Sequence, residues 1–299
     1  MGTVPLVECV PNFSEGRRPD VVAQIVEAIT AVSGVHLLDV HTDASHNRSV
    51  VTCIGPPDAV AEAAFRGAAR AAQLIDLRAH KGVHPRIGAT DVIPFIPVRG
   101  VRMADCVALA RQVGRRIGEE LSIPVYLYGE AATCPDRRYL SAIRRGGFEA
   151  LKAEIATRPE RTPDFGPTKV GPAGATAVGA RFFLIAFNVY LNTDDVEKAR
   201  HIARAVRASS GGLQHVQAMG VLVDGQAQVS MNITDYRRTP LHRALELVRR
   251  EAARYGLTVT HTELVGVAPL EAWVQAAAWY LQVAGFRLTQ VLETHLLDD

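Results

Sequence analysis

The sequence predicts an α+β fold made of two ferredoxin-like (βαββαβ) subdomains, each an α/β sandwich, with a cleft between them. Two observations carry this prediction. Strand-like apolar runs and stretches of helical periodicity follow one another in the order βαββαβ, and this order occurs twice along the chain. The length of 299 residues also suits two domains of about 150 residues each. We expect an N-terminal subdomain at residues 1–178 and a C-terminal subdomain at residues 179–299.

The first βαββαβ set begins with a buried apolar run and a helix whose apolar residues form one stripe. The dipeptide Pro56-Pro57 then opens an alanine-rich helix, with Asp58 in the first turn, where the helix dipole favours an anion. In order, the expected elements are a strand at 6–11, a helix at 18–32, strands at 35–41 and 49–54, a helix from 57 to about 77, and a strand at 92–98.

The second set repeats this order without repeating the residues. Asp224-Gly225 is a strong two-residue hairpin signal, and Asn192 or Thr193 is expected to cap the first helix. In order, the expected elements are a strand at 181–191, a helix from 194 to 208, strands at 217–223 and 227–233, a helix from 240 to 255, and a strand at 257–265.

Between the two sets lies further material of two kinds. A helix at 103–121, a strand at 124–128 and a helical segment around 137–155 extend the first half. A Pro- and Gly-rich stretch at 157–180 follows, too long for an ordinary connection inside a compact domain. It fits a domain linker and a binding loop in the cleft equally well, because clefts between domains are common sites for small ligands.

Composition and charge exclude several classes of protein. The chain has 33 Lys and Arg against 31 Asp and Glu, a net charge of +2, so no strong field attracts a nucleic acid. No window reaches 18 consecutive apolar residues, and the N-terminus lacks the pattern of a signal peptide. We therefore expect a cytoplasmic protein with no membrane partner. The four cysteines form no CxxC pair, and Cys9 and Cys53 fit small buried thiols.

The loop HKGVHPRIGATD, from His80 to Asp91, is the most unusual stretch of the chain. Two imidazoles, an ammonium and a guanidinium fall within seven residues, beside glycines that permit close approach of a ligand. A polar loop is often merely solvated. Here, however, Pro85 stiffens the segment and an apolar strand anchors it, and such rigid support favours a catalytic loop.

A second polar cluster runs from Asp39 to Arg48. Alternation along a strand points Asp39, His41 and Asp43 to one side of the sheet, where they could orient an imidazole or bind an amine. A polar hairpin turn explains the cluster equally well. Metal binding is disfavoured because no familiar ligand spacing is present. The residues of metal-ligand type here are His41, Asp43, His46, His80 and His84, and surface or capping roles are expected for His201, His215, His242 and His295.

Together these segments resemble the glutamate formimidoyltransferase (glutamate formiminotransferase) family, from about Leu6 to Pro269. The motifs that carry the resemblance are VECVPNFSEG, LLDVHTDASHNRSV, HKGVHPRIGATDVIPFIPV, PVYLYGEAA, PDFGP and GARFFLIAFNVYL. The resemblance implies a stand-alone form without the cyclodeaminase domain and two ferredoxin-like subdomains. It implies transfer of a formimino group between N-formimino-L-glutamate and tetrahydrofolate, giving 5-formiminotetrahydrofolate and L-glutamate, in histidine degradation. Tetrahydrofolate is the co-substrate, and no metal is expected.

The resemblance also implies roles for individual residues. The catalytic histidine of the HPR triplet falls on His84. The reaction needs one group of near-neutral pKa that takes up a proton and returns it, which suits an imidazole. We expect His84 to be this general acid and base, with Asp39 or Asp43 orienting a partner and His41 beside them.

Both substrates carry carboxylates, which guanidinium groups bind in a bidentate fork. Arg48 and Arg86 are therefore the candidates for carboxylate binding, with Lys81 attracting the polyglutamate tail of the folate and His80 next to them. The family's folate-binding segment, which follows the DFGP motif, falls on Gly166, Pro167, Thr168, Lys169, Val170, Gly171, Pro172, Ala173 and Gly174.

Three alternatives differ in function. A glutamate formyltransferase that uses 5-formyltetrahydrofolate would need the same site. A non-enzymatic small-molecule-binding module is compatible with the fold, since fold does not fix function, but such a module has no need of the basic loop. An RNA-binding protein is disfavoured because the strands lack paired exposed aromatics. The exposed edges of two open sheets also make us expect a homodimer.

Overall fold

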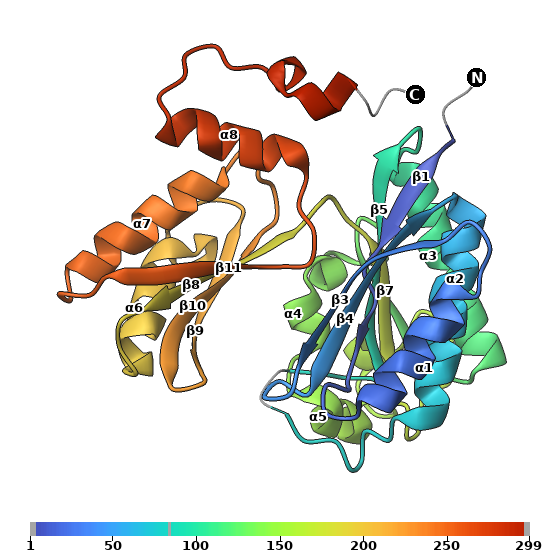
Figure 1. Ribbon diagram of the computed structural model, residues 1–299. Helices are drawn as coiled ribbons and strands as arrows, with labels where there is room; N and C mark the ends of the chain where they lie inside the picture. The colour runs from blue at the N-terminus through green and yellow to red at the C-terminus, as the bar shows by residue number, and fades with distance from the viewer. Residues whose placement is uncertain (1–3, 83–84, 296–299) are drawn as a thin grey trace. The chain divides into compact units, whose positions relative to one another are not determined.

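The computed structural model describes residues 4–82 and 85–295 of the chain. These residues form two compact units, divided between Arg181 and Phe182. Each unit is a β-sheet with helices packed on it (Figure 1), which confirms the predicted α+β class. The domain boundary expected after residue 178 falls inside a strand, just before this division. The cleft that the sequence predicts between them stays a prediction.

The first unit opens with the predicted βαββαβ order. Its strands lie in the spatial order fourth, first, third, second, as a ferredoxin-like sheet requires, with the first strand interrupted into β1 and β2. The elements are β1 (Leu6–Cys9), β2 (Asn12–Phe13), α1 (Pro19–Thr30), β3 (His36–Asp43), β4 (Arg48–Gly55), α2 (Pro57–Leu74) and β5 (Thr90–Arg99).

One expectation about residues 157–180 is wrong. The domain-linker interpretation fails because Thr176–Ala180 form a strand, β7, whose five residues are all buried. This strand lies parallel to β5 on one side and to β6 on the other, so it belongs to the sheet of the first unit. A strand buried on both faces shows no apolar–polar alternation, and its small residues gave no strand signal. The further elements here are α3 (Met103–Glu120), β6 (Val125–Gly129) and β7 (Thr176–Ala180).

The helical segment expected around 137–155 is broken into short pieces. Gly146 and Gly147 both adopt positive φ angles, 78° and 67°, which end one helix and begin the next. The pieces are a 3₁₀ turn η1 (Pro135–Arg138), α4 (Leu140–Ile143) and α5 (Gly147–Glu154), followed by η2 (Pro159–Arg161). The segment is thus a series of short helical turns rather than one helix.

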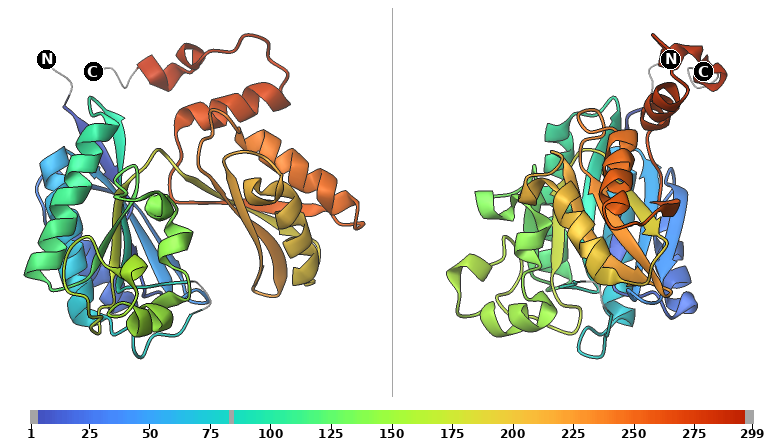
Figure 2. Two further views of the ribbon diagram at one scale, coloured as in Figure 1. Left: turned by 180° about the vertical axis from the view of Figure 1, so that it is seen from behind. Right: turned by 90° about the vertical axis from the view of Figure 1, so that its left-hand side faces the viewer.

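Helices α1, α2 and α3 cover one face of this sheet, and α4 and α5 lie on its other side (Figure 2). On α1 the stripe of Val21, Val22, Ile25 and Ile29 is buried, as its periodicity predicts. Helix α2 packs closely on α1 at Gly67, where a Cβ atom would lie too near the side chain of Ile29.

The second unit repeats the ferredoxin-like order, with its four strands arranged β11-β8-β10-β9. The Asp224-Gly225 hairpin is confirmed, with positive φ angles of 48° and 79°. The elements are β8 (Ile185–Leu191), α6 (Val196–Val206), η3 (Ala208–Ser210), β9 (Val216–Val223), β10 (Gln226–Ile233), α7 (Leu241–Ala253), β11 (Val259–Val265), α8 (Leu270–Tyr280), η4 (Leu288–Gln290) and η5 (Leu292–His295).

Two details differ from expectation in this unit. The first strand begins at Ile185 rather than at residue 181. The cap of α6 is Asp195 rather than Asn192 or Thr193, since its carboxylate accepts hydrogen bonds from the backbone N–H groups of Glu197 and Lys198, at 3.0 and 3.4 Å. Helix α8 lies beyond the last element that the sequence predicted.

No helix in the described part of the chain is long and apolar enough to cross a membrane. Cys9 and Cys53 are free buried thiols, as predicted, and face each other across β1 and β4. Cys106 is also free and buried, whereas Cys134 is free and exposed.

Candidate functional site

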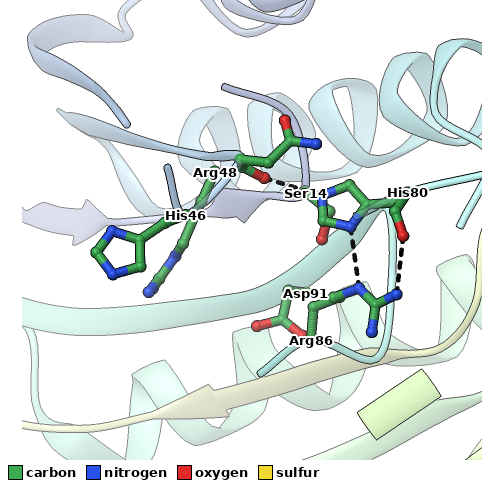
Figure 3. Close-up of a pocket in the computed structure, with 7 residues that line it drawn as sticks. Ser14, His46, Arg48, His80, Arg86 and Asp91 are labelled. Atoms are coloured by element: carbon green, nitrogen blue, oxygen red, sulfur yellow. Dashed lines mark hydrogen bonds between the residues drawn. The ribbon is translucent and has the colours of Figure 1, made fainter. Parts of the chain in front are cut away.

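A small cavity in the first unit, near one end of strands β2, β4 and β5, is lined by polar side chains from segments that are distant in sequence (Figure 3). Its volume of about 10 Å³ is room for roughly one water molecule. We call it the Arg48 pocket. Its lining residues are Ser14, His46, Asn47, Arg48, His80, Arg86 and Asp91.

The register of the sheet explains why these residues meet. Phe13, the last residue of β2, pairs with Ser49 near the start of β4 and with Thr90 at the start of β5. The residues next to these three positions therefore lie together at the same end of the strands. Among them are Ser14, Arg48 and Asp91. The basic loop from His80 to Asp91 leads directly into β5 and so lies at the same end of the strands.

Asn47 connects three loops at this end of the strands through hydrogen bonds of its side chain. Its side-chain oxygen accepts a hydrogen bond from the Gly16 N–H at 2.9 Å, and its side-chain nitrogen donates to the Lys81 carbonyl at 3.0 Å. Its φ of 50° lies in the left-handed region, which asparagine tolerates better than most residues. At Gly82 a Cβ atom would overlap the His46 carbonyl, so the basic loop approaches the β3–β4 turn more closely than another residue allows.

Both ring nitrogens of His80 are used within the site. Nδ1 accepts a hydrogen bond from the Arg86 Nε–H at 2.9 Å, so the proton lies on Nε2, which donates to the Asn47 carbonyl at 2.9 Å. Burial, together with the charge of Arg86, lowers the pKa of His80 below its usual value. His80 is therefore a neutral imidazole that holds Arg86 in place.

Arg86 is itself occupied by a carboxylate. Its Nη2 and Nη1 groups donate to Glu149 of α5 at 2.8 and 3.1 Å in a bidentate pair. The Arg86 side chain is 14% exposed, whereas that of Glu149 is 65% exposed. The guanidinium is thus held in place, and the carboxylate that pairs with it lies on the solvent side.

Arg48 lies deeper in the pocket, and its Nη2 donates to the Asn12 side chain. Burial, reinforced by the like charge of Arg144, lowers the pKa of Arg48 to about 10, although Asp91 and Asp43 act in the opposite direction. The charged groups around Arg48 are thus a second guanidinium, Arg144, and two carboxylates, Asp91 and Asp43.

Asp91 is the buried carboxylate of the pocket, at 2% exposure. One oxygen accepts a hydrogen bond from the Ile87 N–H at 2.8 Å, and the other accepts from the Arg144 guanidinium. The Ser14 hydroxyl donates to the Gly88 carbonyl at 2.7 Å. These bonds hold the end of the basic loop against the sheet and connect it to Arg144 at the end of α4.

Asp39, His41 and Asp43 lie on one side of β3, as the alternation predicts. Their register partners on β4 are Thr52, Val50 and Arg48, so the row shares a sheet face with Arg48. Asp43 accepts hydrogen bonds from both the backbone N–H and the ring of His46. Burial raises the pKa of Asp43, but these hydrogen bonds outweigh it and lower the pKa below its usual range.

Two further residues of the expected site belong to the basic loop, His84 and Lys81. His84 lies outside the described residues. Lys81 is exposed, with its backbone carbonyl bonded to Asn47.

The expected folate segment, residues 166–174, ends next to the basic loop. Gly174 pairs with Gly88, and the Ala89 N–H donates to the Ala173 carbonyl at 2.8 Å. Thr168 and Lys169 are exposed, whereas Val170 is buried. The structure thus brings this segment and the basic loop, which are distant in sequence, into contact.

Sequence reasoning missed several residues of the site and misjudged one histidine elsewhere. Asn47 and Asp91 stand in segments singled out above, but the sequence did not predict that each bonds to several segments. No sequence pattern pointed to Arg144. His242 was expected on the surface or as a cap. That is wrong, since it is 7% exposed and stacks on Trp279. Within the described residues, no group of three or more His, Cys, Asp or Glu side chains is arranged to hold a metal ion.

Comparison with known proteins gives matches over almost the whole chain. The family model described as "Formiminotransferase domain, N-terminal subdomain" matches residues 6–181, and "Formiminotransferase domain" matches residues 186–295. The chain is 51% identical to a glutamate formimidoyltransferase of Thermoplasma acidophilum, with 96% of each chain covered. It is 44% identical to that of Streptococcus pyogenes serotype M1, with 98% of this chain and 99% of the relative covered. It is 49% identical to the formimidoyltransferase-cyclodeaminase of Rattus norvegicus, with 92% of this chain but 52% of the relative covered.

We predict that Asp91→Asn destabilises the protein by about 3 kcal/mol, because it leaves the Arg144 guanidinium without its carboxylate and removes a negative charge near Arg48. Urea unfolding followed by circular dichroism measures this loss. Asp76→Asn is the matched control, since Asp76 pairs with Arg78 on the surface, at 2.5 Å, and its loss should change little. Equal effects of the two substitutions would contradict the structural role of Asp91.

Proposed function

The chain belongs to the formiminotransferase family, and from this premise we propose that it transfers a formimino group between N-formimino-L-glutamate and tetrahydrofolate. The products are 5-formiminotetrahydrofolate and L-glutamate, and tetrahydrofolate is the co-substrate. The observation that carries the proposal is the match along both units to glutamate formimidoyltransferases. The contact between the folate segment and the basic loop at Gly174 and Gly88 supports it.

We assign the carboxylate of the amino acid to Arg48. Its guanidinium is buried beside Arg144, and the two like charges share the nearby carboxylate of Asp91. A bound carboxylate offsets the repulsion between them and accepts charge-assisted hydrogen bonds. The planar guanidinium suits this task better than an ammonium, because it offers two parallel N–H groups.

Arg86 is the second carboxylate position. The Glu149 carboxylate that it binds stands where a substrate carboxylate would lie, so a ligand takes this place by exchange. His80 supports Arg86 rather than touching substrate, since both of its ring nitrogens are already bonded. Lys81 is exposed and placed to attract further carboxylates of a polyglutamate tail.

We assign proton transfer to His84. As the folate nitrogen attacks the formimino carbon, that nitrogen must lose a proton, and the departing amino nitrogen of glutamate must gain one. A single imidazole can take up the first proton and deliver the second, and it performs the same steps in reverse. Asp39 is the better orienting carboxylate, because Asp43 already accepts two hydrogen bonds from His46, and His41 lies between them on β3.

The folate position follows from the segment 166–174. Two of its exposed residues, Thr168 and Lys169, offer a hydroxyl and an ammonium to a ligand, whereas Val170 and Gly174 are buried and fix the segment. The Leu77 N–H donates to the Pro172 carbonyl at 2.8 Å, which holds the segment from the other side. A rigid loop with a few exposed polar groups suits recognition of a small molecule.

We also propose that the protein acts in the cytoplasm as a homodimer. Its described cysteines are all free, as is typical of a reducing compartment. Within the described part of the chain, β3 pairs with β4 alone, so its other edge is open there, and Leu37 and Leu38 on it are exposed. An open edge with apolar residues favours pairing with a second copy.

For the His84 assignment, we expect His84→Ala to lower kcat by about 10²-fold or more, since general acid–base catalysis typically contributes that much. The measurement is the formation of 5-formiminotetrahydrofolate from N-formimino-L-glutamate and tetrahydrofolate. His201→Ala, at an exposed histidine of α6, is the control and should leave kcat unchanged. Activity of His84→Ala within about threefold of wild type would remove His84 from proton transfer. Absence of transfer by the wild-type protein would overturn the function itself.

For the Arg48 assignment, Arg48→Lys should raise the KM for N-formimino-L-glutamate by about tenfold or more, with a smaller effect on kcat, because an ammonium cannot form the bidentate pair. Steady-state kinetics with each substrate varied in turn separates the two parameters. Arg78→Lys, on the surface, is the control. An unchanged KM for N-formimino-L-glutamate would contradict the assignment.

Multi-angle light scattering tests the homodimer. We expect a mass of twice the chain's 32.3 kDa, falling to that of a single chain in Leu38→Lys, because a charge on an open strand edge opposes pairing. A single-chain mass for the wild-type protein would exclude the dimer. A dimer that survives Leu38→Lys would place the interface elsewhere.

A further inference from the structure

The sheet of the second unit has two different faces. Helices α6 and α7 pack on one of them (Figure 1), and the alternate residues of β8 and β10 that point to these helices form the apolar core. The residues between them point to the other face, which we call the polar face. On β8 these include Asn188 and Tyr190, and their register partners on β11 are Glu263 and His261. The polar face thus brings together a carboxylate, an amide, a phenol and an imidazole.

Glu263 is held in place by its neighbours on β8. Its Oε2 accepts hydrogen bonds from the Asn188 amide at 3.0 Å and from the Tyr190 hydroxyl at 3.3 Å. Burial and the charge of Glu263 raise the pKa of Tyr190 above its usual value, so the hydroxyl keeps its proton and donates it. The carboxylate is therefore fixed in position and direction.

The second oxygen of this carboxylate is unused. Among the described residues, no donor reaches Oε1 of Glu263 and no cation pairs with the carboxylate. Glu263 is only half-buried, and its Oε1 keeps contact with solvent. A carboxylate that is held through one oxygen and accessible at the other is arranged to accept N–H groups from a ligand, and its charge makes such hydrogen bonds strong.

An aromatic pair stands beside the carboxylate. The rings of Tyr190 and His261 stack with their centres 4.2 Å apart and their planes at 11°. The Thr260 hydroxyl and Nδ1 of His261 are hydrogen-bonded at 3.0 Å, and the same hydroxyl accepts from the Gln226 amide at 2.8 Å. Because His261 is exposed, this fixed pair offers a planar ring a contact surface next to Glu263.

We propose that Glu263 and the Tyr190–His261 pair bind the pterin ring of tetrahydrofolate. This inference rests on the proposed function, which supplies the co-substrate. One edge of the pterin ring carries an amino group and a ring N–H side by side. These donors bond to the Glu263 carboxylate, while the ring contacts the aromatic pair. The second unit thereby supplies a substrate-binding residue of its own.

The other substrate fits the polar face less well. The formimino group of N-formimino-L-glutamate also carries N–H donors, but the same molecule has two carboxylates. After burial, the charges of Glu263 and Asp224 are what raise the pKa of Tyr190, so the potential around this ring is negative. That potential repels a dicarboxylate, whereas the pterin ring is uncharged.

Calorimetric titration with tetrahydrofolate, kept reduced under nitrogen, tests the assignment without turnover. Glu263→Gln preserves the shape of the side chain but removes its charge, and it should raise the Kd for tetrahydrofolate by about tenfold or more. The Kd for N-(4-aminobenzoyl)-L-glutamate, which has the tail of the folate but not the ring, should stay within about threefold. Glu197→Gln, at an exposed ion pair on α6, is the matched control and should change neither constant.

Steady-state kinetics gives a second measurement. Glu263→Gln should raise the KM for tetrahydrofolate far more than the KM for N-formimino-L-glutamate, with little effect on kcat. The reverse order would place the formimino group on the polar face and overturn the assignment. His261→Ala, at an exposed position, should raise the Kd for tetrahydrofolate by about threefold or more because the ring loses a contact.

An unchanged Kd for tetrahydrofolate in Glu263→Gln overturns the assignment, and so does an equal loss of affinity for the tail without the ring. If circular dichroism shows that Glu263→Gln does not fold, His261→Ala decides, and unchanged affinity there overturns the assignment. Transfer by the wild-type protein together with any of these results leaves the proposed function standing. Tetrahydrofolate bound through Glu263 without any wild-type transfer would instead overturn the proposed function and keep this site.

Discussion

The buried carboxylate of Asp91 is the interaction on which the organisation of the first unit depends most. It pairs with the Arg144 guanidinium, and its charge also acts on Arg48. Charges removed from water need partners of fixed geometry, because an unpaired one costs several kcal/mol. That requirement fixes where β5 begins, how the basic loop enters it, and where α4 ends.

Much of the fold follows from the sequence, because its elements carry local signals. The stripe of Val21, Ile25 and Ile29 and the Asp224-Gly225 turn are readable without any long-range contact. The strand β7 is not, since Thr176–Ala180 consist of small residues whose strand conformation comes from β5 and β6 on either side. The prediction of a helical segment around 137–155 was wrong in its continuity for a local reason, because the paired glycines Gly146 and Gly147 interrupt it.

The candidate site was predictable in its residue types but not in its connections. Arg48, His80 and Arg86 do line one cavity, and they stood out because charged and imidazole groups are concentrated near them. Arg144 and Glu149 could not be found this way, because each meets its partner only after α4 and α5 pack on the sheet. Likewise, the environment of His242 depends on α8, which comes later in the chain.

The bidentate contact between Glu149 and Arg86 has a kinetic consequence. A carboxylate that enters at Arg86 replaces one pair of charge-assisted hydrogen bonds with an equivalent pair, so the exchange itself yields little net free energy. The resident carboxylate thus acts as a built-in competitor that weakens every acidic ligand at this position to a similar degree. Glu149 remains tethered nearby at high local concentration, so it re-forms its contact as soon as a ligand begins to leave. Under the role proposed for Arg86, this arrangement favours rapid release of a bound carboxylate over its tight retention.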